Sequence, residues 1–282
     1  MTVNSEWITH LPIKGIKSVS PVSGGDINES YCVKTSQKKY FMKVQPNRGK
    51  GFFAHEVEGL KLLSQAALTP KVITYGQVGK DGYLILNWID FGTGSQYQLG
   101  QTVAKVHQIH NKKFGLDHDF KLGKIPKNNH WQNSWTKFYI NQRLDPLVNL
   151  AKKNHVWNSF RERHYQNLRT TFIKYYSNPK HKVVPSLLHG DLWFGNVGFT
   201  ADGKPMLIDP DAFFGDREMD LAMTTVFGGF NDQFYKGYNS IYPIKPGFQQ
   251  RLPWYQFNYL MAHLNLFGET YGSSVDSILS QY

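Results

Sequence analysis

The chain has 282 residues, of which 40% are hydrophobic and 15% aromatic, and this composition argues against a disordered chain. The length allows one large domain or two small ones, and the single cysteine, Cys32, excludes an internal disulfide framework and a cysteine zinc cluster. The formal net charge is +11, but residues 183–282 carry a net charge of −5, which nucleic-acid binding does not explain.

The first 89 residues are predicted to form a small β-rich lobe. Short β-prone runs cover residues 15–45, broken by a tight turn at Gly24 and Gly25. Residues 51–65 carry apolar side chains at helical spacing. Two further runs, VITYGQV and GYLILNWI, flank turn residues and predict a hairpin.

Residues 90–282 are predicted to form a larger, mainly helical lobe after a short connector near residues 87–94. Helical patterns cover residues 99–110, much of 131–176 and most of the last 60 residues. Two short apolar runs, PSLLHGDLWFGNVGF and KPMLIDPDAFF, predict an embedded β-hairpin with polar loops at the strand ends. The predicted fold class is therefore α+β, with two lobes.

The strongest chemical signal is the pattern H-G-D-x-x-x-x-N, followed by an aspartate at the end of an apolar run. Phosphoryl transfer needs one carboxylate to orient the attacking hydroxyl and accept its proton. It also needs an amide oxygen and a second carboxylate to hold Mg²⁺ on the nucleotide phosphates. The spacing therefore predicts Asp191 as the catalytic base, Asn196 and Asp209 as ligands of Mg²⁺, and a nucleotide as the phosphate donor.

A lysine within the apolar strand pattern YFMKV is predicted to bind the nucleotide phosphates. Lys43 would contact the α- and β-phosphates and be held by a glutamate of the following helix. Glu56 is favoured for this pairing and Glu58 is the rival. Only one of them can face Lys43, because residues two positions apart on a helix point to different faces. Gly24 and Gly25 would let the backbone approach the phosphates, since glycine has no Cβ.

The connector between the lobes is predicted to bind adenine through its backbone. The candidates are Leu86, Asn87 and Ile89, and this role restricts their side chains only loosely. Residues 1–89 would thus bind the nucleotide, and residues 90–282 would carry the catalytic and acceptor-binding groups.

These motifs resemble those of the fructosamine kinase (ketosamine kinase) family, whose relatives include aminoglycoside phosphotransferases and choline kinases of the protein-kinase-like fold. The pattern H-G-D-x-x-x-x-N alone is typical of the wider phosphotransferase group, whereas its form here, HGDLWFGN, is similar to the ketosamine branch. The stretches DPDAFFGDREMDLAMTTVFGGF and HLNLFG, at residues 209–230 and 263–268, are similar to the ketosamine branch. The resemblance covers nearly the whole chain.

The resemblance implies an ATP- and Mg²⁺-dependent kinase that phosphorylates a ketosamine, usually at the sugar 3-hydroxyl. Fructosamine and ribulosamine adducts, free or protein-bound, are the implied substrates, and phosphorylation makes the adduct unstable, which is a deglycation or repair activity. Trp193 would be a platform for the sugar, and His263 would line the same pocket. Asp211 stands where the family more often has a small residue, which adds a carboxylate near the metal. Asn87 stands at a connector position where members of the family often have glutamate.

Other functions remain open at this point. An aminoglycoside kinase would have an acidic cleft, which the carboxylates of residues 211–220 could supply, and a choline kinase is a further small-molecule alternative. A non-catalytic nucleotide-binding protein would not need the complete catalytic set. A nucleic-acid-binding module would use the basic part of the chain, but we expect no nucleic-acid partner.

Location and assembly are predicted from composition. The N-terminus lacks the apolar run of a signal peptide, and no stretch of about 18 apolar residues occurs, so neither a signal peptide nor a membrane helix is expected. A single cysteine fits a reducing, cytoplasmic compartment. We expect no membrane partner and a monomer or weak homodimer.

Overall fold

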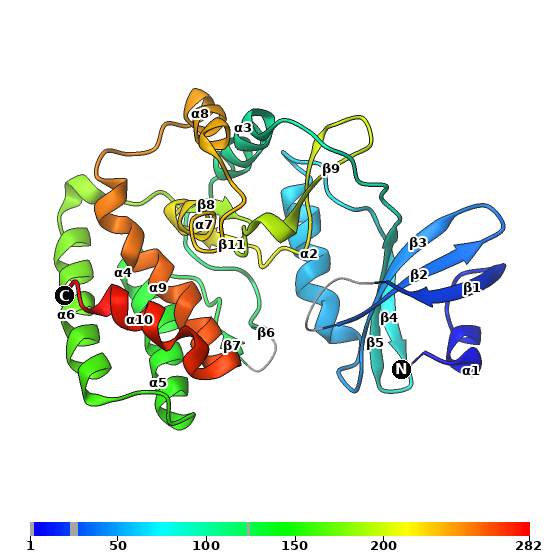
Figure 1. The fold of residues 1–282 in the computed structure, drawn as a ribbon, viewed down its shortest axis with the longest axis horizontal. Coiled ribbons are helices and arrows are strands. Elements are labelled where there is room, and N and C mark those ends of the chain that lie inside the picture. Colours follow the sequence, from blue (N-terminus) through cyan, green and yellow to red (C-terminus); the bar gives the residue numbers. More distant parts are fainter. Residues whose placement is uncertain (1–2, 23–27, 123–124) are drawn as a thin grey trace.

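The computed structural model describes residues 3–22, 28–122 and 125–282, which form two lobes (Figure 1). The N-terminal lobe contains a five-stranded sheet of order β1-β2-β3-β5-β4, in which all neighbouring strands are antiparallel. Its strands are β1 Ile16–Pro21, β2 Glu29–Thr35, β3 Lys39–Gln45, β4 Val72–Val78 and β5 Asp81–Asn87. The predicted strands and the β4–β5 hairpin are confirmed. The predicted turn at Gly24 and Gly25 lies outside the described residues.

Helix α2, Ala54–Leu63, lies between the sheet and the C-terminal lobe (Figure 1). One side packs on the sheet, where Leu60 belongs to a buried cluster with Leu84 and Leu86 of β5. On another side Gly59 meets the C-terminal lobe, because a Cβ there would lie 2.9 Å from Cγ of Pro210. Glycine at this position therefore lets α2 approach the loop that carries Asp209.

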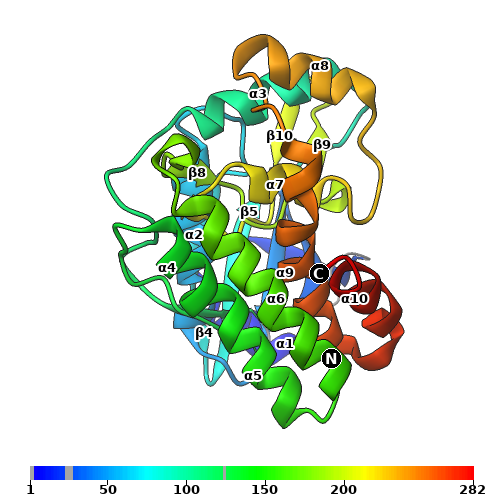
Figure 2. The same cartoon turned by 90° about the vertical axis from the view of Figure 1, so that its left-hand side faces the viewer.

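The C-terminal lobe is mainly helical, as predicted. Aromatic rings of α4, α6 and α9 contact one another in its core, including Tyr139, Phe172 and Tyr255. Figure 2 shows α4, α5, α6 and α9 packed as a bundle. The helices are α3 Gln96–His107, α4 Trp135–Tyr139, α5 Asp145–Lys153, α6 Ser159–Tyr176, α7 Glu218–Met223, α8 Asp232–Ile241, α9 Phe248–Phe267 and α10 Gly272–Leu279.

Short strand pairs position the polar loops of this lobe. The predicted embedded hairpin is β9 with β10, whereas β8 pairs with β11, which follows the Asp209 loop. A third pair, β6 with β7, projects toward α2 in Figure 1. These strands are β6 Phe120–Leu122, β7 Ile125–Lys127, β8 Ser186–Leu188, β9 Val197–Phe199, β10 Pro205–Leu207 and β11 Phe213–Gly215.

Two elements are absent from the sequence prediction, the β6–β7 hairpin and the helix α1, Ser5–Thr9. Strands of three residues and a helix of five are too short to show a hydrophobic period. Within the described part of the chain, no helix is both long enough and apolar enough to cross a bilayer.

Candidate active site

The loop after β8 carries the predicted base and is fixed by buried hydrogen bonds. The carboxylate of Asp220 accepts from the backbone N–H groups of His189 and Gly190, at 2.6 and 2.9 Å. Gly190 has a φ of +84°, and a Cβ there would lie 1.8 Å from the carbonyl oxygen of Asp211. Only glycine fits this close approach, so the loop and the Asp211 segment are held backbone against backbone.

Asp191 and Asn196 are brought together within this loop. Nδ2 of Asn196 donates to both Oδ2 and the backbone oxygen of Asp191, each at 2.9 Å. Burial, followed by the neighbouring carboxylate of Asp211, raises the pKa of Asp191 to about 7. A carboxylate with a raised pKa is better matched to proton transfer near neutral pH than an ordinary aspartate.

Asp209 follows β10 and adopts a left-handed backbone conformation, with a φ of +57°. Its carboxylate contacts Nζ of Lys43, and that Nζ also lies 2.8 Å from Oε1 of Glu56. Burial alone would lower the pKa of Lys43, but the two carboxylates outweigh it and raise that pKa above its ordinary value. Glu58 points elsewhere, with Oε2 3.1 Å from Nδ1 of His118.

The oxygen atoms left over at this site fit a hard divalent cation. Nδ2 of Asn196 is used by Asp191, so its Oδ1 remains as the amide oxygen available to a ligand. The side chain of Asp209 is 44% exposed and contacts Lys43 through Oδ1, so its carboxylate can be reached by a cation from solvent. Carboxylate and amide oxygens are the ligand types that Mg²⁺ takes from proteins.

The connector residues differ in their burial and in their hydrogen bonds. The side chain of Leu86 is buried in the core under α2. The backbone N–H of Asn87 donates to the carbonyl of Lys71, and its Oδ1 accepts from the N–H of Lys71, so this residue ties β5 to the start of β4. Ile89 is half-buried just beyond β5. Gly24 and Gly25 lie outside the described residues.

Trp193 and His263 lie on one aromatic edge of the C-terminal lobe. The Trp193 side chain is 40% exposed, and its ring centroid is 6.4 Å from that of Phe227. The Phe227 ring is in turn 4.8 Å from the ring of His263, which lines a cleft together with Asp191. Burial lowers the pKa of His263, so its imidazole is neutral at neutral pH.

The acidic cluster of residues 211–220 is buried and occupied by structural partners. Asp216 accepts from Tyr255 Oη at 2.6 Å, and Glu218 lies 2.7 Å from Arg251. Asp220 holds the loop after β8, and Asp211 contacts Lys127 and His55. These carboxylates therefore do not form an open acidic cleft.

One residue of the cleft, Lys127, has no signal in the sequence. It lies in the segment KIPKNN, which shows neither a motif nor a periodic pattern. The structure places it in the lining of the cleft that also contains Asp191 and His263. Its partner, Asp211, could be noticed from the sequence only as an unusual residue after Asp209.

A family model described as fructosamine kinase matches residues 1–282. The protein named "Probable ketoamine kinase" in Lactiplantibacillus plantarum is 56% identical over 282 residues, which are 100% of both chains. An Arabidopsis thaliana protein named "Protein-ribulosamine 3-kinase, chloroplastic" is 31% identical, over 98% of this chain and 86% of the relative.

Solved structures show the same architecture. A Haemophilus somnus protein with the provisional name fructosamine-3-kinase is 28% identical, with a TM-score of 0.84 over 94% of this chain and 91% of that chain. An aminoglycoside phosphotransferase, APH(4)-Ia, is 13% identical, with a TM-score of 0.62 over 94% of this chain and 95% of that chain, a likeness of fold. The predicted two-lobed, protein-kinase-like α+β fold is confirmed.

Proposed function

The chain belongs to the fructosamine kinase family, and we propose that it transfers the γ-phosphoryl group of ATP to the 3-hydroxyl of ketosamines. The observation that carries this proposal is the convergence of Lys43, Asp209, Asn196 and Asp191, from both lobes, beside a cleft. The name of the Arabidopsis relative supports ribulosamine adducts as substrates and the 3-hydroxyl as the acceptor.

In this proposal each polar group of the site has one task. Asp191 orients the acceptor hydroxyl and takes up its proton as the oxygen attacks. Asn196 and Asp209 hold Mg²⁺, which when bound neutralises charge on the phosphate oxygens. Lys43, fixed by Glu56, binds the phosphates of ATP. The protein thus contributes positioning and charge stabilisation, which are the main needs of phosphoryl transfer.

The remaining predicted residues would bind the two substrates. Gly24 and Gly25 would approach the phosphates, and backbone groups near Leu86, Asn87 and Ile89 would face adenine. Because the N–H of Asn87 is already bonded to Lys71, its contribution to adenine binding would come from its carbonyl.

The acceptor side would be formed by Trp193, as a platform for the sugar, and by His263, in the cleft beside Asp191. Phosphorylation would destabilise the adduct, so the activity would be deglycation, on free or protein-bound ketosamines. We propose a cytoplasmic monomer or weak homodimer for this enzyme.

The aminoglycoside alternative is disfavoured by the pairing of the acidic cluster. A polycationic substrate calls for unpaired carboxylates in its cleft, whereas Asp211, Asp216, Glu218 and Asp220 are all buried and partnered. The sequence identity with the aminoglycoside phosphotransferase is 13%, against 56% with a ketoamine kinase.

ATP consumption measured across ribulosamine, erythrulosamine and fructosamine adducts tests the proposal, with aminoglycosides and choline as controls. We expect turnover with at least one ketosamine and a loss of about 10³-fold or more in Asp191→Asn, with ATP binding retained. The matched control is Asp202→Asn, at an exposed aspartate on the β9–β10 turn. Turnover of aminoglycoside or choline but of no ketosamine would overturn the substrate assignment, and near-normal activity of Asp191→Asn would overturn the role of Asp191.

A further inference from the structure

A second buried ionic cluster lies next to the proposed catalytic site and is not used by the proposed chemistry. Its members are Lys127 of β7, Asp211 of the loop after β10, and His55 of α2. Nζ of Lys127 contacts Oδ2 of Asp211, and Nε2 of His55 lies 3.2 Å from Oδ1. All three side chains are largely buried, with exposed fractions of 13%, 5% and 6%.

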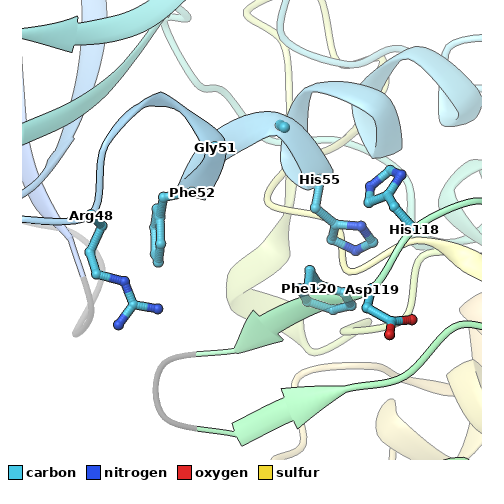
Figure 3. Close-up of a pocket in the computed structure, with 8 residues that line it drawn as sticks. Arg48, Gly51, Phe52, His55, His118, Asp119 and Phe120 are labelled. Carbon is cyan, nitrogen blue, oxygen red and sulfur yellow. The ribbon is translucent and has the colours of Figure 1, made fainter.

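The cluster fastens the β6–β7 hairpin to α2. The imidazole of His55 stacks on the ring of Phe120 in β6, with centroids 3.5 Å apart and planes inclined by 11°. Figure 3 shows His55 of α2 above Phe120, with His118 beside them. Lys127, on the other strand, lies over the same Phe120 ring, its Nζ 5.6 Å from the centroid. Both strands of the hairpin are therefore tied to His55 and Asp211.

The same cluster fastens the hairpin to the loop after β8, residues 189–196, which is called the catalytic loop here because it carries the proposed base Asp191. The backbone N–H of Asp211 donates to the carbonyl of His189 at 2.8 Å, and Gly190 lies directly against the Asp211 carbonyl. Lys127 and Asp211 line the cleft that contains Asp191 and His263. The hairpin thus forms part of the wall of the proposed acceptor cleft, whose lining among the described residues includes neither Lys43 nor Glu56.

We propose that Lys127 and Asp211 are a positioning pair that fixes the β6–β7 hairpin against the catalytic loop and thereby sets the binding of the acceptor, not of ATP. The pair sets acceptor binding through the hairpin and the loop, and neither side chain transfers the proton or the phosphoryl group. The identity of the acceptor rests on the function proposed above, whereas the anchoring of the hairpin does not.

Neutral substitutions can test this pair, because an unpaired buried charge lowers stability. Removing one partner leaves the other as an uncompensated buried charge, which is strongly destabilising, whereas replacing both by neutral groups of similar size is often tolerated. Lys127→Met and Asp211→Asn are near-isosteric single changes, and the amide oxygen that Asp211→Asn introduces could still accept from His55. The double variant removes the ion pair between Lys127 and Asp211 without leaving either charge alone.

The experiment compares the parent, both single variants and the double variant, with Lys137→Met as the matched control. Lys137 is an exposed lysine on α4. For each protein we would measure KM for the acceptor, KM for ATP, kcat, the midpoint of thermal unfolding, and amide hydrogen exchange over residues 125–132.

We expect thermal unfolding to be lowered in the single variants and largely restored in the double variant. In all three variants the acceptor KM should rise about tenfold while the ATP KM changes less than about twofold, because a loosened wall weakens acceptor binding selectively. Amide exchange over residues 125–132 should be faster in the double variant than in the parent and unchanged in Lys137→Met.

Two results would overturn the proposal. One is a double variant with parental acceptor KM and parental exchange, which would make the pair a replaceable part of the core. The other is an equal rise of both KM values, which would indicate a general disturbance of the site. If the parent phosphorylates no ketosamine, the proposed function fails, but hydrogen exchange still decides whether the pair anchors the hairpin.

Discussion

Asp209 and Asp211 are separated by one residue on the same loop, yet they serve different regions of the molecule. Asp209 contacts Lys43 of the N-terminal lobe and its side chain is 44% exposed, whereas Asp211 contacts Lys127 of the β6–β7 hairpin and its side chain is 5% exposed. Each region also takes one residue from the first turn of α2, Glu56 in the first and His55 in the second.

The difference in exposure separates two uses of the same ion-pair chemistry. A carboxylate that is open to solvent keeps an oxygen for an incoming cation, so the pair with Lys43 is suited to binding. A carboxylate that is closed in on all sides is satisfied by its neighbours, so the pair with Lys127 is suited to holding segments together. Changes in the first region should therefore affect chemistry, and changes in the second should affect stability and the shape of the acceptor cleft.

Among the variants that test this comparison, the largest effect is expected from Asp209→Asn, on turnover. We expect kcat to fall about 100- to 1000-fold, because a neutral amide would hold less tightly the Mg²⁺ that is proposed to neutralise charge on the phosphate oxygens. The midpoint of thermal unfolding should change by less than about 3 °C, since this side chain is partly exposed. Steady-state kinetics and calorimetry on the same preparation measure both quantities. A large loss of stability without a loss of kcat would contradict the assignment of the Asp209 region to chemistry and of the Asp211 region to stability.

The second effect is expected from Asp211→Ala, on stability. The charge of Lys127 would be left buried without its partner, and we expect the free energy of unfolding to fall by about 3 kcal/mol. Urea unfolding followed by fluorescence is the measurement, and adding Lys127→Met should recover most of the loss. A single variant as stable as the parent would show that the cluster is not a stabilising tie.

A third, intermediate effect is expected at the two glutamates of α2. Glu56→Gln removes the carboxylate that fixes Lys43, and we expect kcat/KM for ATP to fall about tenfold to a hundredfold. Glu58→Gln removes a contact with the part-exposed His118 and should change kcat/KM for ATP by less than about twofold. The two variants are matched in size and position, so equal losses would mean that the geometry of the Lys43 pair does not govern ATP use.

The smallest effect is expected from Gly59→Ala, which tests how the two regions share α2. The added methyl group would lie 2.9 Å from Pro210, and we expect a cost of about 1–2 kcal/mol as the helix moves away from the loop. Because both aspartates flank Pro210, the ATP KM and the acceptor KM should rise together. A change confined to one of them would show that the regions respond independently to the position of α2.

The sequence alone predicted most of the elements and those candidate site residues that belong to a local pattern. The strands of the N-terminal lobe and the long helices were predictable from alternation and helical spacing. The set Asp191, Asn196 and Asp209 was predictable because its spacing matches the needs of phosphoryl transfer. The family resemblance, carried by motifs that are continuous in the chain, pointed to the same chemistry.

Only the tertiary structure decided how distant side chains are paired. Lys127 and Asp211 are 84 residues apart, and no local pattern indicates that the two meet. The acidic cluster could be an open cleft or a set of buried ties until its partners were seen, because burial depends on what packs against a segment. The choice between Glu56 and Glu58 likewise depends on the direction in which α2 lies against β3, which is set by contacts with the sheet and with Pro210.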